Sequence, residues 1–397
     1  MDIDWEQKKR GFRAVYFIYL LIYFTVLFML YYNQTAVLYN GANNFESDTA
    51  VHIRMAVVDG YYHSLAAFVY LFFAKIVRFE AALMLIATLL AILTVGAIPL
   101  TAGLVREVLK RSGVELYDPL IWVIAFAGNI LIAFYVKAAN RAHYIGYQSP
   151  NMWHNSTYTF MRFFAILTMI VFLKLYDDYK DKVSIWKWLL FTLLLTVTTG
   201  FKASFLTVFA PVLAIVLIRD LCKKTKFLNV FFMALSVVPP IAVMVVQSIV
   251  LSGTDGSNGY AIKPFAALSM RGDHPKAALV LSVLFPVILL LAHIKDFYKD
   301  KYYFWSLVMW AVGFVEVFLF IETGERALDS NFMWGYSISL FFLFVSSMIR
   351  LFKDLFVEKT SIVVKIIGCV AAAALVWHVV SGINYLSILY SGVTYFA

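Results

Sequence analysis

An acidic residue and a histidine lie one helical turn apart in the first polar stretch of the chain. The segment 43–54 reads Asn-Asn-Phe-Glu-Ser-Asp-Thr-Ala-Val-His-Ile-Arg, and Ser47 or Asp48 could cap a helix over 49–59. On that helix Asp48 and His52 share one face, so the carboxylate could take a proton from a sugar hydroxyl beside the imidazole. The alternative, which this stretch alone favours, is a solvated helix on which Asp48 only satisfies backbone amides. The flanking candidate substrate contacts are Glu46 and Arg54.

A second polar stretch, residues 144–157, is dense in aromatic and amide side chains. This mixture suits sugar binding, because aromatic faces pack against pyranose C–H groups while amides and histidine hydrogen-bond the hydroxyls. The alternative is an interfacial aromatic belt, which explains Tyr144 and Trp153 but not the polar residues beside them. The predicted sugar contacts are Gln148, Asn151, Trp153, His154 and Asn155.

Two cationic side chains could hold a phosphate. Lys202 lies between two short apolar runs, where snorkelling towards water is the default and phosphate contact is the competing interpretation. Arg326 lies in a loop with four charges within eight residues, and its guanidinium could bind phosphate oxygens in a bidentate manner. An exposed loop with an internal Glu325–Arg326 pair would show the same pattern without function. The candidate contacts from this loop are Glu322, Glu325, Arg326, Asn331 and Trp334.

The composition indicates that a membrane positions these groups. Of the 397 residues, 62% are hydrophobic and 14% are charged, whereas a soluble domain carries about 25% charged residues. Unbroken apolar runs such as 11–32, 81–105 and 228–251 have the length of a membrane-crossing helix. We therefore predict an all-α, polytopic transmembrane helical bundle. The formal charge of +9 then reflects basic loops between spans and not a nucleic-acid partner.

The basic loops predict which side of the membrane each segment faces. They lie at 106–111, 219–226, 295–301 and 350–359, and the positive-inside rule places all four in the cytoplasm. All four share that side only if the apolar stretch 61–77 does not cross, so we predict for it a helix at the outer interface. About eleven spans result by length and charge bias, with the N-terminus inside and the C-terminus outside. The predicted spans are 11–32, 81–105, 118–136, 158–175, 187–200, 203–219, 228–251, 276–294, 302–321, 334–350 and 361–380.

These spans predict one transmembrane domain, 1–397, with its polar chemistry gathered on the outer side. The outer segments are 33–80, 137–157, 251–275 and 322–333. The sequence contains no HExxH, CxxC, Walker or GxSxG motif, so a metalloprotease, ATPase or hydrolase would lack its chemistry. We predict neither a metal ligand nor a cofactor.

The arrangement of these segments resembles the GT-C superfamily of polyprenyl-dependent membrane glycosyltransferases. The shared features are a retained first span, a long first outer loop with an acidic residue on a surface helix, and an interfacial helix before the second span. By this resemblance Asp48 matches the acidic residue of the first outer loop, with Glu46 as the second choice. The Trp153-His154-Asn155 stretch and the 322–334 loop look like those of bacterial members that decorate surface polysaccharide or teichoic acid.

The resemblance implies transfer of a sugar from a polyprenyl-phosphate carrier to a glycan or lipid-linked acceptor at the outer face of the cell membrane. A polyprenyl phosphate is already a good leaving group, so the enzyme needs one base and fixed positive charge but no general acid. Asp48 would be the base, and Lys202 and Arg326 would hold the phosphate. His52 or His154 would orient the reacting groups. A single displacement implies inversion at the anomeric carbon.

Two other functions remain open from the sequence. A polysaccharide polymerase or ligase would use lipid diphosphate donors and several outer arginines, for which Arg141, Arg271 and Arg326 are available. A transporter or flippase for a lipid-linked sugar would place ionisable groups or broken helices near mid-membrane and would show two related halves. Asn129 and Glu316 do lie inside predicted spans, although a buried, hydrogen-bonded acid facing the bundle also explains Glu316.

Overall fold

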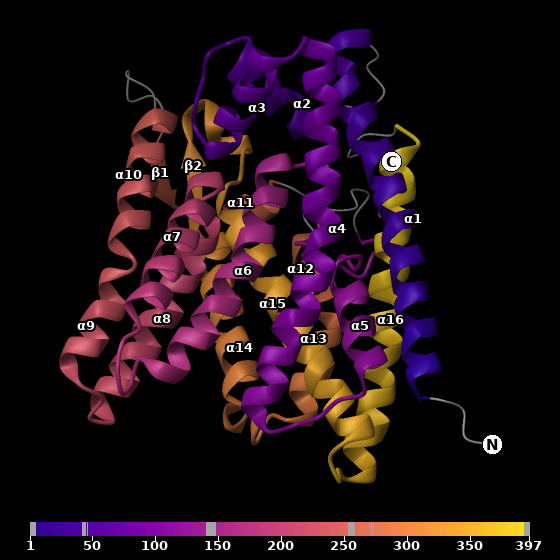
Figure 1. Ribbon diagram of the computed structural model, residues 1–397, viewed down its shortest axis with the longest axis vertical. Coiled ribbons are helices and arrows are strands. Elements are labelled where there is room, and N and C mark those ends of the chain that lie inside the picture. The colour runs from indigo at the N-terminus through magenta and orange to yellow at the C-terminus, as the bar shows by residue number, and fades with distance from the viewer. Residues whose placement is uncertain are drawn as a thin grey trace.

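The chain folds into an all-α helical bundle with one short antiparallel pair of strands (Figure 1). The computed structural model describes residues 5–41, 45, 47–139, 148–252, 259–270, 272 and 274–392. The helices are α1 (Trp5–Asn40), α2 (Asp48–Val57), α3 (Leu65–Ile76), α4 (Phe79–Ser112), α5 (Asp118–Gly128), α6 (Ser156–Asp178), α7 (Ile185–Phe201), α8 (Ser204–Cys222), α9 (Phe227–Leu235), α10 (Val238–Ser252), α11 (Ala266–Ser269), α12 (Pro275–Ser282), α13 (Leu284–Ala292), α14 (Lys301–Leu319), α15 (Phe332–Phe356) and α16 (Ile362–Tyr390). The remaining elements are β1 (Gly259–Ile262), β2 (Phe320–Thr323) and the 3-10 helices η2 (Phe297–Lys299) and η3 (Gly324–Leu328).

Many of these helices are long and apolar enough to cross a membrane. In the part of the chain that the structure describes there are eight such segments, and α12 with α13, bent by 61° at their break, would make a ninth. The eight are α1, α4, α6, α8, the α9–α10 run, α14, α15 and α16. In α15, 83% of the most apolar window is buried in the bundle, against 22% in α1 and 28% in α16. The protein is therefore a multi-pass membrane protein with α15 at its centre and the outer faces of α1 and α16 against lipid.

The predicted span 118–136 is not one helix. Helix α5 has 11 residues and ends at Gly128, after which residues 129–135 continue without regular structure inside the bundle. Non-helical backbone at membrane depth is tolerated only where other protein groups satisfy it. The His378 ring donates to the Ile132 carbonyl oxygen at 2.6 Å, and the Tyr135 N–H donates to the Ser381 hydroxyl at 3.2 Å. Helix α16 thus supplies the hydrogen bonds that a longer α5 would have made internally.

The predicted span 187–200 corresponds to α7, whose 17 residues fall just below the usual length for a crossing helix. Helix α3, within the stretch 61–77, has 12 residues, which reach only about 18 Å at 1.5 Å per residue. In Figure 1, α1 ends and α4 begins at the same end of the bundle, and α3 stays at that end between them. The α3 helix therefore does not connect the two ends.

The two ends of the bundle differ in chemistry. Helix α2, α3 and the β1–β2 pair lie at the upper end in Figure 1, whereas all four basic loops lie at the lower end, after α4, α8, α13 and α15. The N-terminal end of α1 lies at the lower end and the C-terminal end of α16 at the upper end. We call these the polar end and the basic end. The positive-inside rule predicts that the basic end faces the cytoplasm.

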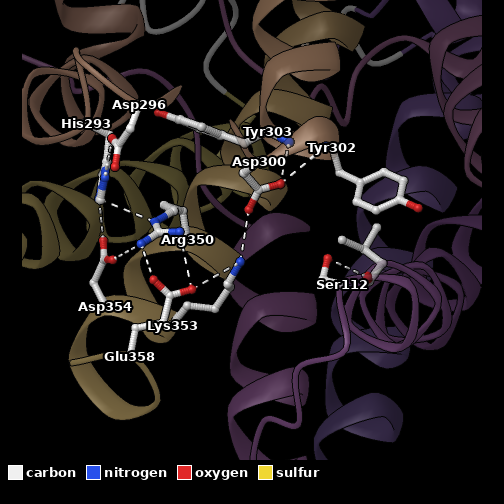
Figure 2. Close-up of polar contacts among 11 residues, drawn as sticks. Ser112, His293, Asp296, Asp300, Tyr302, Tyr303, Arg350, Lys353, Asp354 and Glu358 are labelled. Carbon is white, nitrogen blue, oxygen red and sulfur yellow. Dashed lines mark hydrogen bonds and ion pairs between the residues drawn. The ribbon is translucent and has the colours of Figure 1, made fainter. Parts of the chain in front are cut away.

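Buried ion pairs hold the helices together at the basic end (Figure 2). Asp300 caps α14 by accepting the backbone N–H groups of Tyr302 and Tyr303 at 3.2 Å, and it pairs with Lys353 of α15 at 3.0 Å. Lys353 is 5% exposed, so its charge depends on these partners. The network continues through His293, Arg350, Asp354 and Glu358.

Candidate active site

Asp48 is the first residue of α2, and its side chain points towards the start of α6. Ser47 is the residue that caps the helix, since its hydroxyl accepts the Ala50 N–H at 3.4 Å. The Asp48 carboxylate instead accepts a hydrogen bond from the Asn155 amide at 2.7 Å. About a third of the Asp48 side chain, 36%, remains exposed. The carboxylate is therefore positioned by a second element and still open to a reactant.

Residues 154 and 155 connect α2 to α6. The backbone N–H and the hydroxyl of Thr49 both donate to the His154 carbonyl oxygen at 3.2 Å. Asn155 caps α6 by accepting the Tyr158 N–H at 2.9 Å while its amide nitrogen donates to Asp48. One side chain thus fixes both the start of α6 and the Asp48 carboxylate, so the two move together.

Two histidines lie beside Asp48. Nε2 of His154 is 3.9 Å from the Asp48 carboxylate, and its Nδ1 is 2.7 Å from the Tyr385 hydroxyl. His52 follows Asp48 by one turn of α2, and its Nδ1 is 3.5 Å from the Ser156 hydroxyl. His52 belongs to α2 and His154 to the segment before α6, so the two imidazoles come from different elements. The spacing of Asp48 and His52 predicts only the first of these two neighbours.

The electrostatics keep the carboxylate ionised and the imidazoles neutral at pH 7. Burial alone would raise the pKa of Asp48, but His154, His52, the Asn155 amide and Lys202 together lower it below its ordinary value. Burial lowers the pKa of His52 to about 3 and that of His154 to about 4. An ionised carboxylate beside neutral imidazoles can accept a proton, which is the property a general base requires.

Lys202 places a positive charge at the same site. It lies between α7 and α8, and its ammonium donates to the Thr157 hydroxyl at 3.3 Å and lies 4.3 Å from the centre of the Trp334 ring. Burial lowers its pKa to about 8, against the opposing effect of Asp48 and two further carboxylates, Glu322 and Asp329. The carboxylates that act on Lys202 therefore come from two segments, the start of α2 and the 322–334 loop.

Gly200 allows the approach that brings Lys202 here. A Cβ atom at this position would lie 2.5 Å from Cδ1 of Leu65, the first residue of α3. The Gly200 carbonyl oxygen also accepts the Gln247 side-chain amide of α10 at 2.7 Å. Close packing of α3 and a hydrogen bond from α10 thus fix the end of α7 immediately before Lys202.

The 322–334 loop lies at the same end but is largely engaged with itself. Glu322 accepts the backbone N–H and the amide of Asn331 at 2.9 and 2.5 Å. Arg326 pairs with Asp329 at 2.7 Å and reaches the Leu251 carbonyl oxygen at 3.4 Å. Helix α2, which begins with Asp48, and β2, which leads into the η3 turn with Arg326, lie at the same end of the bundle (Figure 1). A phosphate would have to share Arg326 with Asp329.

Several predicted contacts lie elsewhere. Arg54 lies on an exposed face of α2. Asn151 is fully buried and donates to the Gly128 and Leu131 carbonyl oxygens at 3.0 and 2.7 Å. The predicted contacts Gln148 and Trp153 are also buried, at 2% and 1% exposed. Gln148, Asn151 and Trp153 are therefore enclosed by protein, whereas Arg54 faces outward. Glu46 lies outside the described residues, and of Glu325 only the backbone is described.

Tyr385 and Ser156 belong to the site although their sequence context does not indicate it. Tyr385 follows an apolar run on α16, which extends ten residues beyond the predicted limit of 380 to Tyr390. Ser156 accepts the Tyr70 hydroxyl of α3 at 2.6 Å and contacts His52. Each is recognisable only from its partner in another segment.

An apolar cavity lies away from this site. It has a volume of about 60 Å³ and is bounded by α4, α6, α8, α14 and α15, near the end of α4 and the start of α14. Its lining includes Phe172, Trp305 and Phe342. It is smaller than the cavity of about 150 Å³ that accommodates benzene in an apolar core, so it is a packing void and not a sugar site.

Comparison with known proteins identifies no family for this chain. No protein-family model matches the sequence, and no matching protein is found among those with curated descriptions.

Proposed function

We propose that this protein is a membrane glycosyltransferase that moves a sugar from a polyprenyl-phosphate carrier to a hydroxyl of a glycan or lipid-linked acceptor. The observation that carries the proposal is the pairing at the polar end of a partly exposed carboxylate, Asp48, with a cation, Lys202. Both contact the start of α6, Asp48 through Asn155 at 2.7 Å and Lys202 through Thr157 at 3.3 Å, and the Thr157 hydroxyl donates to Asn155 at 2.9 Å. A base next to fixed positive charge is what displacement of a phosphate by an alcohol requires.

In the proposed reaction Asp48 accepts the proton of the acceptor hydroxyl. The acceptor oxygen forms a bond to the anomeric carbon as the bond from that carbon to the phosphate oxygen breaks. The departing carrier phosphate keeps the electron pair, and Lys202 stabilises its charge. Arg326 would assist after exchanging its contact with Asp329 for the phosphate. A single displacement inverts the anomeric configuration.

The polar end opposes the four basic loops, which supports an outer location for this chemistry in the cell membrane. A lipid carrier is held in the bilayer by its tail and presents its head group at the membrane surface. A site at the end of a helical bundle therefore meets that head group without the carrier leaving the membrane.

The test is a transfer assay with the full-length protein reconstituted into lipid vesicles. Polyprenyl-phosphate sugars are supplied with a cell-envelope glycan acceptor, and carrier release and glycan labelling are both measured. Asp48→Asn is expected to abolish transfer while the protein remains folded. Asp59→Asn is the matched control, because Asp59 is an exposed carboxylate just after α2. Equal transfer by Asp48→Asn and the unaltered protein contradicts the proposal.

The same vesicles test the two other functions. Turnover restricted to lipid diphosphate donors would indicate a polymerase or ligase. Passage of uncleaved lipid-linked sugar across the bilayer would indicate a transporter. Glu316 within α14 accepts a hydrogen bond from the Thr207 hydroxyl at 3.2 Å, as expected for a buried acid facing the bundle. We therefore assign Glu316 no part in the transfer reaction.

A further inference from the structure

An arginine without a polar partner lies inside the bundle below the candidate site. Arg162 belongs to α6 and is 3% exposed. Its Nη1 atom is buried and makes no hydrogen bond, and none of the described residues forms an ion pair with it. Other buried basic groups differ, as Lys353 pairs with Asp300 and Arg111 pairs with Asp177. Arg162 is therefore an unexplained charge at membrane depth.

The groups around Arg162 do not compensate its charge. The guanidinium lies 5.8 Å from the centre of the Phe341 ring, and a single cation–π contact is worth less than the cost of removing a cation from water. The tyrosine hydroxyls near enough to act on it are those of Tyr23, Tyr31 and Tyr158, and all three already have other partners. Tyr23 donates to the Asn129 carbonyl oxygen at 3.3 Å. Tyr158 donates to the Pro150 carbonyl oxygen at 2.9 Å, and Tyr31 shares a hydrogen bond with Thr94 at 2.9 Å.

Arg162 lies on the face of α6 that leads to the site. Asn155 and Tyr158 precede it by seven and four residues, which places all three on one side of the helix. The Tyr158 ring is 5.4 Å from the Trp334 ring, which also lies 4.3 Å from the Lys202 ammonium. Phe341 follows Trp334 by two turns on α15. Ring contacts between α6 and α15 therefore connect Lys202 at the polar end with the part of α6 that carries Arg162.

We propose that Arg162 binds the phosphate of a phosphate-bearing lipid at a position deeper in the bundle than Lys202. An intramembrane cation that faces the bundle and lacks a protein partner indicates a ligand of opposite charge. A phosphate offers oxygens in the geometry that a guanidinium binds best. The inference rests on the proposed function only in the choice of a polyprenyl chain for the lipid.

The test compares ligand-induced stabilisation of three proteins in lipid nanodiscs: the unaltered chain, Arg162→Met and Arg111→Met. The probes are polyprenyl phosphate, the uncharged polyprenol and inorganic phosphate, and the readout is the unfolding temperature across a titration. Arg162→Met is expected to raise the unfolding temperature without ligand, because it removes an uncompensated buried charge. It is also expected to weaken polyprenyl-phosphate binding by roughly 30-fold or more.

The control behaves in the opposite way. Arg111 is paired with carboxylates, so Arg111→Met is expected to lower the unfolding temperature and to leave the response to polyprenyl phosphate unchanged. Arg162→Gln gives the same readout if the methionine variant fails to fold. Inorganic phosphate shows whether the site takes a lipid phosphate or free phosphate. An Arg162-dependent response to inorganic phosphate without a response to polyprenyl phosphate means that the site takes free phosphate and not a lipid.

A response to polyprenyl phosphate that is equal in the unaltered protein and the Arg162 variants overturns the proposal. Equal stabilisation by polyprenol and polyprenyl phosphate also overturns it, as does the absence of any response to the phosphate probes. The measurement requires no sugar transfer, so its outcome is separate from that of the transfer assay.

Discussion

The hydroxyl of Tyr385 lies 2.7 Å from Nδ1 of His154, and through that ring the last helix of the bundle reaches Asp48 at the start of α2. The Tyr385 ring also packs 5.7 Å from Trp153, which is 1% exposed. The imidazole is therefore held from its Nδ1 side while Nε2 faces the carboxylate at 3.9 Å. This geometry makes Tyr385 a positioning residue for the proposed base.

Removing the Tyr385 hydroxyl is expected to slow transfer without blocking substrate binding. Loss of a buried hydrogen-bond partner costs about 1–3 kcal/mol, so Tyr385→Phe should lower kcat by roughly 5- to 150-fold. The KM for the lipid donor should change little, because Tyr385 acts through His154. Tyr390→Phe, at an exposed position on the same helix, is the control. Steady-state kinetics in vesicles give both constants, and an unchanged kcat would show that Tyr385 only packs.

The local features of the site could be predicted from the sequence. The spacing of Asp48 and His52 predicts that they share one face of a helix, and the position of Lys202 between two short apolar runs predicts a charge near the membrane surface. The positive-inside rule predicts that the four basic loops lie at the same end of the bundle, and in Figure 1 they do. Periodicity and charge bias are set by residues that are close together in the sequence, so the sequence alone reveals them.

Features that depend on distant partners could not be predicted. The apolar run after Asp118 has the length of a span, yet the helix stops at Gly128 because His378 and Ser381 satisfy the following backbone. The sequence around Tyr385 does not distinguish it from the residues of α16 that face lipid. Asn151 looks like a sugar ligand beside His154, but its amide is used by two backbone carbonyl groups.

The close packing of α16 on the non-helical segment gives a prediction about stability. A Cβ atom at Gly382 would lie 2.0 Å from the Ile130 carbonyl oxygen and 2.8 Å from its carbon, and backbone atoms cannot move aside easily. Gly382→Ala should destabilise the protein at or above the upper end of the usual range for overpacking, about 1–3 kcal/mol. Unfolding in detergent measures the effect.

The matched control for that substitution is Gly103→Ala in α4. A Cβ atom there meets only Cδ1 of Ile170, at 3.8 Å, which is ordinary contact. Alanine is the better helix former by about 1 kcal/mol, so Gly103→Ala should be neutral or stabilising. Similar losses for the two variants would contradict the packing of α16 described here.

The ion pairs at the basic end predict coupled effects. Lys353→Met leaves the largely buried Asp300 carboxylate unpaired and should destabilise the protein by up to about 3 kcal/mol (Figure 2). The double variant Lys353→Met with Asp300→Ser should recover part of that loss, because serine still caps α14 and carries no charge. A double-mutant cycle of unfolding free energies measures the coupling. Simple additivity would show that the pair contributes nothing, and transfer at the polar end should be unaffected.

The charge of Lys202 predicts the alkaline limit of activity. Burial lowers its pKa to about 8, so the ammonium is present below that pH and is lost as the pH rises through it. The pKa of Asp48 lies below its ordinary value, so the proposed base stays ionised throughout this range. The kcat/KM of transfer should therefore fall as the pH rises above about 8.

Substitution at Lys202 tests whether this residue sets that limit. A guanidinium stays charged beyond about pH 12, so Lys202→Arg should retain part of the activity and lose the decline above pH 8. Lys202→Gln should lower activity at every pH, since it removes the charge that stabilises the leaving phosphate. Lys75→Gln, at an exposed position on α3 at the same end, should keep the unaltered profile. A decline near pH 8 that persists in Lys202→Arg would assign the titration to another group and remove Lys202 from the leaving-group side of the mechanism.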